Sequence, residues 1–189
     1  MSKTLAHGII TIVVVGTLAI ITLGLFRPAS PISINQNNRN SNGTIQVGLH
    51  KGDAAPNFTL TTVDGQKMSL SDYRGRPVML NFWMINCEGC QYEMPGMEKV
   101  YSRRQGAQKD LVVLGIDASD SATDIKQFAL QHHYTYPMLE DVHSYTGQLY
   151  ALRGTPTSYF IDRKGFIYTS NEGALDEGTL QQMIQQISA

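Results

Sequence analysis

The sequence predicts an α/β fold for residues 52–189, with helices on both faces of a sheet. Strand and helix patterns alternate along this part of the chain, which is typical of layered α/β domains. The chain has 189 residues, of which 42% are apolar and 16% charged, enough for one ordinary globular domain and an additional segment. The two cysteines of the sequence lie three positions apart, directly after an apolar run. Together these observations predict a single α/β domain whose chemistry is that of a cysteine pair.

The individual elements follow from local patterns. Asp64-Gly65 is a typical hairpin turn and separates two short strand-like segments. Apolar runs predict the other strands, and helix-compatible segments lie between them. We expect strands at 58–63, 67–70, 78–83, 111–117, 136–139, 157–162 and 166–168, and helices at 87–104, 122–132, 142–151 and 177–187.

The N-terminal segment differs from the rest of the chain. Residues 8–26 carry no charge, and as a helix they would span about 28 Å, close to the roughly 30 Å hydrocarbon core of a bilayer. This predicts a transmembrane anchor after a short cytoplasmic head at 1–7. A cleaved signal peptide is the alternative, although its apolar region is usually about 7–15 residues and ends at small residues. Either way, the folded domain is expected on the extracytoplasmic side of the cell membrane.

Residues 27–51 are rich in Asn, Ser, Pro and Gly. Such a segment cannot bury enough apolar surface to order itself, so we expect a flexible tether between anchor and domain. The formal net charge is −1, which gives no reason to expect a nucleic-acid partner.

The cysteines form the sequence Cys87-Glu88-Gly89-Cys90 at the predicted junction of a strand and a helix. The spacing allows a disulfide within one helical turn and places the first sulfur over the helix N-terminus, where free N–H groups and the dipole stabilise a thiolate. We therefore expect Cys87 to attack a substrate disulfide and Cys90 to resolve the mixed disulfide. A purely structural disulfide would restrict the unfolded chain very little, because the loop that it closes is so small. No further cysteine or histidine lies at ligand spacing, so we expect no metal and no cofactor.

Two glutamates accompany the cysteines. Glu93 is three residues after Cys90 and should share its helix face, in position to take the Cys90 proton. Glu88 lies between the cysteines, and nearby carboxylates oppose thiolate formation, which favours a reducing pair. The alternative is that both are solvated acids at a helix N-terminus. Trp83 ends the preceding strand and is expected beside the site, with core packing as the alternative.

Several ordered motifs are similar to a known family. They are Ala55-Pro-Asn-Phe-Thr-Leu60, the run from Leu70 to Trp83, the Cys-Glu-Gly-Cys motif, and the segment from Gly154 to Asp162. The chain resembles the membrane-anchored bacterial thioredoxin-like oxidoreductases of the TlpA/ResA type, in the AhpC/TSA-Redoxin superfamily. The resemblance implies a thioredoxin-like fold with a central mixed sheet and an N-terminal β-hairpin extension.

The same resemblance assigns further site residues. It places glutamates at positions 88 and 93, and makes Thr155-Pro156 the cis-proline loop that faces the disulfide and offers its backbone to an extended substrate. Two positions depart from the family. Asn86 replaces an aromatic residue before the first cysteine, which makes this surface more polar, and Gly89 replaces a proline, which loosens the helix start.

The leading functional interpretation is an extracytoplasmic thiol–disulfide oxidoreductase that acts as a reductant. The resemblance implies exported disulfide proteins as substrates, such as the haem-binding Cys-x-x-Cys-His of apocytochromes c. It also implies a membrane dithiol donor of the CcdA/DsbD kind, and we expect a monomer.

Three other functions make different demands on the residues of this chain. A disulfide oxidase stays open, because the sequence fixes the redox couple and not its direction. A copper metallochaperone of the Sco type uses Cys-x-x-x-Cys and a distant histidine, for which His143 is the candidate, but the cysteine spacing here is one residue short. A peroxiredoxin would need Thr three and Pro seven residues before its cysteine, where this chain has Met84 and Leu80.

Overall fold

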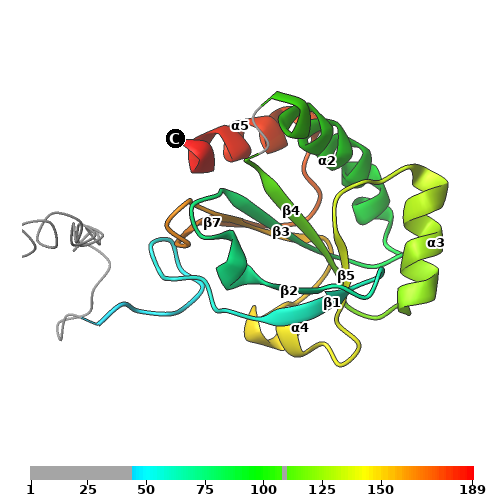
Figure 1. The fold of residues 1–189 in the computed structure, drawn as a ribbon, viewed down its shortest axis with the longest axis horizontal. Helices are drawn as coiled ribbons and strands as arrows, with labels where there is room; N and C mark the ends of the chain where they lie inside the picture. The colour runs from blue at the N-terminus through cyan, green and yellow to red at the C-terminus, as the bar shows by residue number, and fades with distance from the viewer. Residues whose placement is uncertain (1–43, 108–109) are drawn as a thin grey trace, which may run out of the picture. The chain divides into compact units, whose positions relative to one another are not determined.

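The computed structural model describes residues 44–107 and 110–189 (Figure 1). The predicted head, the predicted anchor at 8–26 and most of the predicted tether lie outside these residues. Among the helices that are described, none has the length and apolar character needed to cross a bilayer.

A single mixed sheet forms the centre of the domain, with strand order β2-β1-β5-β4-β3-β6-β7. Parallel pairing joins β4 to β3 and to β5, and the remaining neighbours are antiparallel. The strands are β1 (Thr59–Thr62), β2 (Lys67–Ser69), β3 (Val78–Trp83), β4 (Val112–Asp117), β5 (Met138–Glu140), β6 (Thr157–Ile161) and β7 (Ile167–Glu172). The predicted mixed sheet is confirmed, and the β1–β2 hairpin extends it at one edge.

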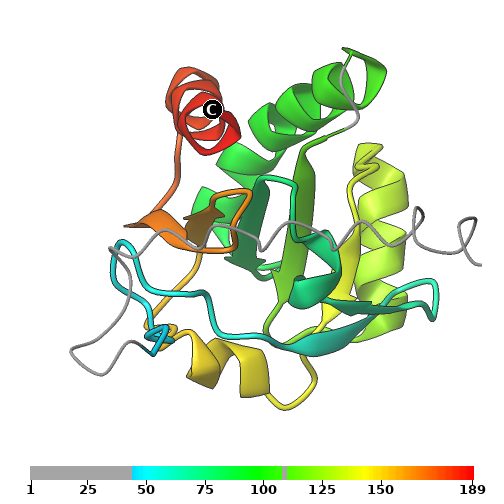
Figure 2. The same cartoon turned by 60° about the vertical axis from the view of Figure 1, so that its left-hand side comes forward.

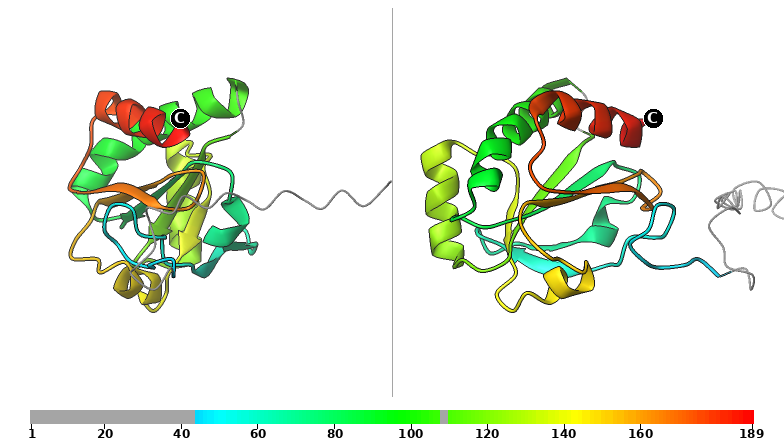
Figure 3. Two further views of the ribbon diagram at one scale, coloured as in Figure 1. Left: turned by 90° about the vertical axis from the view of Figure 1, so that its left-hand side faces the viewer. Right: turned by 180° about the vertical axis from the view of Figure 1, so that it is seen from behind.

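Helices cover both faces of this sheet, as expected. They are α2 (Glu88–Ala107), α3 (Ala122–His132), α4 (Tyr145–Leu149) and α5 (Glu177–Ser188), with a short 3-10 helix η2 (Leu70–Tyr73). Figures 2 and 3 show α2 and α5 side by side over one face, while α4 lies over the opposite face. Ion pairs join α2 to α5, because Lys99 and Arg103 both contact Glu177.

The core consists of two apolar clusters, one on each face. Met79 and Trp83 of β3 belong to the cluster under α2, α3 and α5, whereas Leu80 and Phe82 belong to the cluster on the α4 side. This alternation is the period of two that a strand imposes. It follows that Asn81 faces the α2 side, although it is polar and fully buried.

Some boundaries differ from the sequence prediction. The helix expected at 142–151 spans only Tyr145–Leu149, where the buried carboxylate of Asp141 accepts the N–H groups of Thr146 and Gly147. The strand expected at 166–168 continues to Glu172, because β7 pairs along the whole of β6. The η2 turn was not anticipated.

The N-terminal limit of the domain also differs. Residue 52 was the expected start, but the N–H of Ala54 donates to Gln46 O at 2.8 Å and that of Gly48 donates to Ala54 O at 3.1 Å. Leu49 packs against the cluster on the α4 side. Part of the segment assigned to the tether therefore belongs to the folded unit.

Candidate active site

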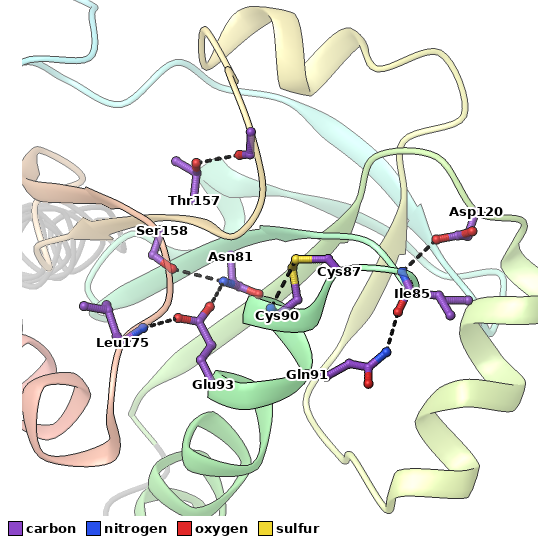
Figure 4. The surroundings of a disulfide bond; sticks show 11 residues. Asn81, Ile85, Cys87, Cys90, Gln91, Glu93, Asp120, Thr157, Ser158 and Leu175 are labelled. Carbon is purple, nitrogen blue, oxygen red and sulfur yellow. Dashed lines mark hydrogen bonds between the residues drawn. A yellow bond between two sulfur atoms is a disulfide. The ribbon is translucent and has the colours of Figure 1, made fainter.

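Cys87 and Cys90 form a disulfide at the N-terminus of α2, with an S–S distance of 2.06 Å (Figure 4). The N–H of Cys90 donates to Cys87 Sγ at 3.1 Å. Cys87 is 9% exposed and Cys90 has no exposed surface. Of the two residues, Cys87 keeps the exposed surface, and its sulfur already receives an N–H donor of the helix terminus, as the spacing predicted.

The loop before Cys87 is held from two sides. Asp120, after β4, accepts the N–H of Ile85 at 2.9 Å, and the Gln91 side chain of α2 donates to Ile85 O at 2.7 Å (Figure 4). Both backbone polar groups of this residue are therefore satisfied by side chains. The contacts fix the path from the end of β3 into α2, and with it the position of the first cysteine.

The Thr155–Pro156 peptide bond is cis, as the resemblance implied. A Cβ at Gly89 would lie 3.2 Å from Pro156 Cδ, so the proline ring packs directly on the residue between the cysteines. The N–H of Gly173 donates to Pro156 O at 2.8 Å and ties this loop to the end of β7. Within the described residues, the backbone N–H and C=O of Thr155 take no hydrogen bond. They remain available to pair with an extended chain.

Glu93 is buried, with 1% exposure, and each of its carboxylate oxygens accepts a hydrogen bond. Asn81 Nδ2 donates to Oε1 at 2.5 Å, and the N–H of Leu175 donates to Oε2 at 2.9 Å (Figure 4). Burial raises the pKa of Glu93 to about 7, against the opposing effect of these two donors. Such a group can gain or lose a proton near neutral pH, as the predicted role requires.

Glu88 is exposed to solvent, and the structure places it in the first turn of α2. It therefore lies apart from the buried network of Glu93. The alternative interpretation, a solvated acid at a helix N-terminus, describes its position.

A second buried acid lies at the end of β4. Asp117 has no exposed surface, and its Oδ1 accepts the N–H groups of Ser119 and Asp120 at 2.8 and 2.6 Å. Burial and, to a smaller extent, the nearby Asp120 carboxylate raise the pKa of Asp117 to about 6, against the opposing effect of the two N–H donors. The sequence analysis did not single out this residue.

Trp83 is fully buried and packs against Phe128, with ring centroids 5.3 Å apart. It has no surface to offer a protein substrate in this structure. The expected substrate contact is therefore not available to Trp83, and the core-packing alternative describes its position. It supports the site from beneath, since it ends the strand that leads to the cysteines.

Sequence reasoning missed Asn81 and Ser158, which link Glu93 to the sheet. Asn81 Nδ2 also donates to Ser158 Oγ at 3.0 Å, and both residues are buried. A signal was present, because Asn81 is the one polar residue in the apolar run from Val78 to Trp83. A polar side chain inside a buried strand needs a partner, and its partner is the acid of the site.

Within residues 44–107 and 110–189, no group of three or more His, Cys, Asp or Glu side chains is arranged to hold a metal ion. His143, the candidate for a copper site, lies in the exposed loop before α4.

The sequence pattern of the AhpC/TSA family matches residues 51–170. The chain is 34% identical over 141 residues to the thiol-disulfide oxidoreductase ResA of Oceanobacillus iheyensis, covering 72% of each chain. It is 33% identical over 139 residues to the thioredoxin-like protein YneN of Bacillus subtilis, covering 74% of this chain and 81% of that one.

Solved structures show the same similarity. A Chlorobium tepidum protein, provisionally assigned as the thiol:disulfide interchange protein DsbE, has a TM-score of 0.68 and 30% identity, covering 74% of this chain and 99% of that one. The exposed lipoprotein thioredoxin of Streptococcus pneumoniae has a TM-score of 0.61 and 28% identity, covering 69% and 99%. The thioredoxin-like fold expected from the sequence is thus confirmed for the described domain.

Proposed function

We infer that this chain, which belongs to the AhpC/TSA family and is a thiol–disulfide oxidoreductase of the ResA type, reduces protein disulfides outside the cytoplasmic membrane. The observation that carries the proposal is the disulfide at the N-terminus of α2 with a buried glutamate three residues beyond its second cysteine. This arrangement combines an accessible sulfur, a buried sulfur and a proton acceptor.

The reaction begins at the accessible sulfur. The Cys87 thiolate attacks one sulfur of a substrate disulfide, a mixed disulfide forms, and the other substrate sulfur leaves as a thiolate that takes a proton from water. Free N–H groups at the start of α2 stabilise the attacking thiolate.

The second step uses the buried half of the pair. Cys90 loses its proton to Glu93, its thiolate attacks Cys87 Sγ, and the second substrate sulfur leaves and is protonated. Two electrons have then passed from the dithiol to the substrate, and the protons balance through water, because Cys87 and Glu93 release the two protons that the substrate thiolates take up. The Cys87–Cys90 disulfide of the structure is the oxidised product of this sequence.

The proposed direction of electron flow, from the cysteine pair to the substrate, rests on the carboxyl groups near the cysteines. The buried carboxyl of Glu93 near Cys90 and the exposed carboxylate of Glu88 both oppose negative charge on the cysteine sulfurs. A less stable dithiolate favours oxidation of the pair and hence reduction of a substrate. The alternative is a disulfide oxidase that runs the same exchange in reverse.

The proposed location of the domain rests on the predicted anchor at residues 8–26. Such a segment would hold the domain at the extracytoplasmic side of the membrane, and a pneumococcal protein of similar structure is itself an exposed lipoprotein. We propose exported disulfide proteins as substrates, apocytochrome c among them. A membrane dithiol donor of the CcdA/DsbD kind would re-reduce the pair, and the chain would act as a monomer.

The decisive measurement is the reduction potential of the full chain in detergent, equilibrated in defined thiol–disulfide buffers. We expect a value near or below the roughly −270 mV of thioredoxin. A value near the roughly −120 mV of a strong periplasmic oxidant would reverse the proposed direction. The Cys87→Ser variant is the control, because it can form no internal disulfide and should show no transition.

A further inference from the structure

Asn81 lies at the centre of β3, between Gly115 of β4 and Ser158 of β6 in the sheet register. It is fully buried. Its Nδ2 donates to two acceptors, Glu93 Oε1 at 2.5 Å and Ser158 Oγ at 3.0 Å, while its Oδ1 has no partner among the described residues. The nitrogen end of the amide is therefore fully used, and the oxygen end is not.

The two oxygens of Glu93 have donors of different kinds. Oε2 accepts the backbone N–H of Leu175, which cannot become an acceptor. Oε1 faces the side-chain amide of Asn81, which carries a donor at one end and an acceptor at the other. A proton on Oε2 would break the contact with Leu175. A proton on Oε1 needs only an acceptor in place of Nδ2.

We propose that Asn81 is a positioning residue that turns its amide by 180° when Glu93 changes protonation state. With the carboxylate, Nδ2 donates to Oε1, and with the acid, Oδ1 accepts the proton that Oε1 then carries. The inference rests on the proposed function, in which Glu93 takes the Cys90 proton during the second exchange step. It assigns that proton to one oxygen, Oε1.

Ser158 is suited to follow this turn, because a hydroxyl both donates and accepts. Its Oγ accepts from Nδ2 in the first orientation and its O–H donates to Oδ1 in the second. One end of the amide lacks a partner in either orientation, so the contacts with Glu93 and Ser158 decide between the two. The planar amide has nearly the same shape both ways, and the turn needs no movement of the backbone.

Other titratable groups face Glu93 from the neighbouring elements. Cys90 shares its helix, Lys99 lies further along α2, and Asp176 and Glu177 at the start of α5 line the same groove. The pKa of Tyr136, before β5, responds to the charge of Glu93. Burial and the two donors, Leu175 and Asn81, set the pKa of Glu93, and the Asn81 amide contact decides which oxygen takes the proton.

Nuclear magnetic resonance of the labelled, detergent-solubilised full chain tests the turn directly. We expect the Asn81 side-chain amide signals to move between roughly pH 5 and pH 9, with the same midpoint of about 7 as Glu93. In Glu93→Gln the glutamine nitrogen must donate to Asn81 Oδ1 while its oxygen accepts from Leu175. The amide signals should then stay at the low-pH position of the parent at every pH. Signals that keep the high-pH position in this variant would overturn the proposal.

Kinetics provide a second readout. Asn81→Leu removes both the donor and the acceptor at similar volume, so the second exchange step should slow by about fivefold on either side of the midpoint, the equivalent of one hydrogen bond. Ser158→Ala, which leaves the Glu93 contact in place, should slow it by about twofold. A purely structural Asn81 would lower stability and leave rate and midpoint unchanged, which would contradict the proposal.

The two proposals fail in different ways. If Glu93→Gln keeps the parent rate and pH profile, Glu93 does not take the Cys90 proton and the proposed second step is wrong. If that variant is slow but the Asn81 amide does not titrate in the parent, the second step stands and the turn of Asn81 is refuted.

Discussion

Two buried acids lie on the same face of the sheet, and they differ in where their partners come from. Glu93 receives its hydrogen bonds from Asn81 of β3 and from Leu175 before α5, which are distant in the sequence. Asp117 receives its hydrogen bonds from the backbone N–H groups two and three residues further along the chain, those of Ser119 and Asp120. Burial raises the pKa of both, to about 7 and about 6.

This difference indicates that Glu93 is part of the active site, whereas Asp117 has a structural role in the fold. Partners that are close in sequence shape a turn, and Asp117 shapes the turn that leads from β4 to α3. Partners brought together by the whole fold hold a side chain at one place under the cysteines, and this describes Glu93. We therefore expect Glu93 to control exchange and stability, and Asp117 to control stability alone.

The largest expected effect is on the stability of Glu93→Gln. The native state holds the Glu93 proton up to about pH 7, whereas the unfolded state releases it near the ordinary glutamate pKa of 4.5. The parent therefore loses stability as pH rises through this window, and the loss is complete above it. Relative to the parent, the variant should gain about 3 kcal/mol between pH 4 and pH 8 (approximate limits of the window).

Urea unfolding of the oxidised proteins at each pH measures this gain. Contributions from other acids are common to both proteins and cancel in the difference. Glu88→Gln is the matched control, since Glu88 is exposed, and its difference from the parent should stay flat. A flat difference for Glu93→Gln would mean that burial does not perturb this carboxyl.

The next effect is on the exchange rate of the same variant. Without a carboxylate to take the Cys90 proton, the second exchange step should slow by about 10- to 100-fold above pH 7, the range of general base catalysis or somewhat below it. The increase of rate with pH through about 7 in the parent should disappear. Single-turnover reduction of a model disulfide peptide measures both. Asp117→Asn should keep the parent profile, and an equal loss there would remove the distinction between the two acids.

The sequence predicted the cysteine chemistry, the order of the elements and the cis bond at Pro156, because each has a local or motif-level signal. It identified Glu93 from its spacing to Cys90. It could not show that this residue is buried, or that Asn81 and Ser158 hold it, because these contacts join β3, β6 and α2 only in the folded chain. The helix expected at 142–151 is shorter for a similar reason, since the buried carboxylate of Asp141 holds the N–H groups at the start of α4.

A smaller effect is expected for the stability of Asp117→Asn. The native pKa of about 6 lies above the ordinary aspartate pKa of 3.8, so the parent loses stability as pH rises between these values. Removing the acid should make the variant more stable than the parent by about 2 to 3 kcal/mol above this window, slightly less than for Glu93 because the pKa shift is smaller. Urea unfolding across the same pH series measures it. A gain that develops only above pH 7, roughly one unit too high, would assign the titration to a different group.

The smallest effect tests whether the two acids are independent. Asp120→Asn removes the charge beside Asp117 and keeps an oxygen that can accept the N–H of Ile85. The midpoint of Asp117 should fall, because a like charge near a carboxyl raises its pKa. The midpoint of Glu93 should not move, since its pKa is set by burial, Leu175 and Asn81. Carbon-detected titration of the side-chain carboxyls resolves both groups in one sample. If Glu93 moves as far as Asp117, the two acids titrate as one system, and the separation of site from scaffold does not hold.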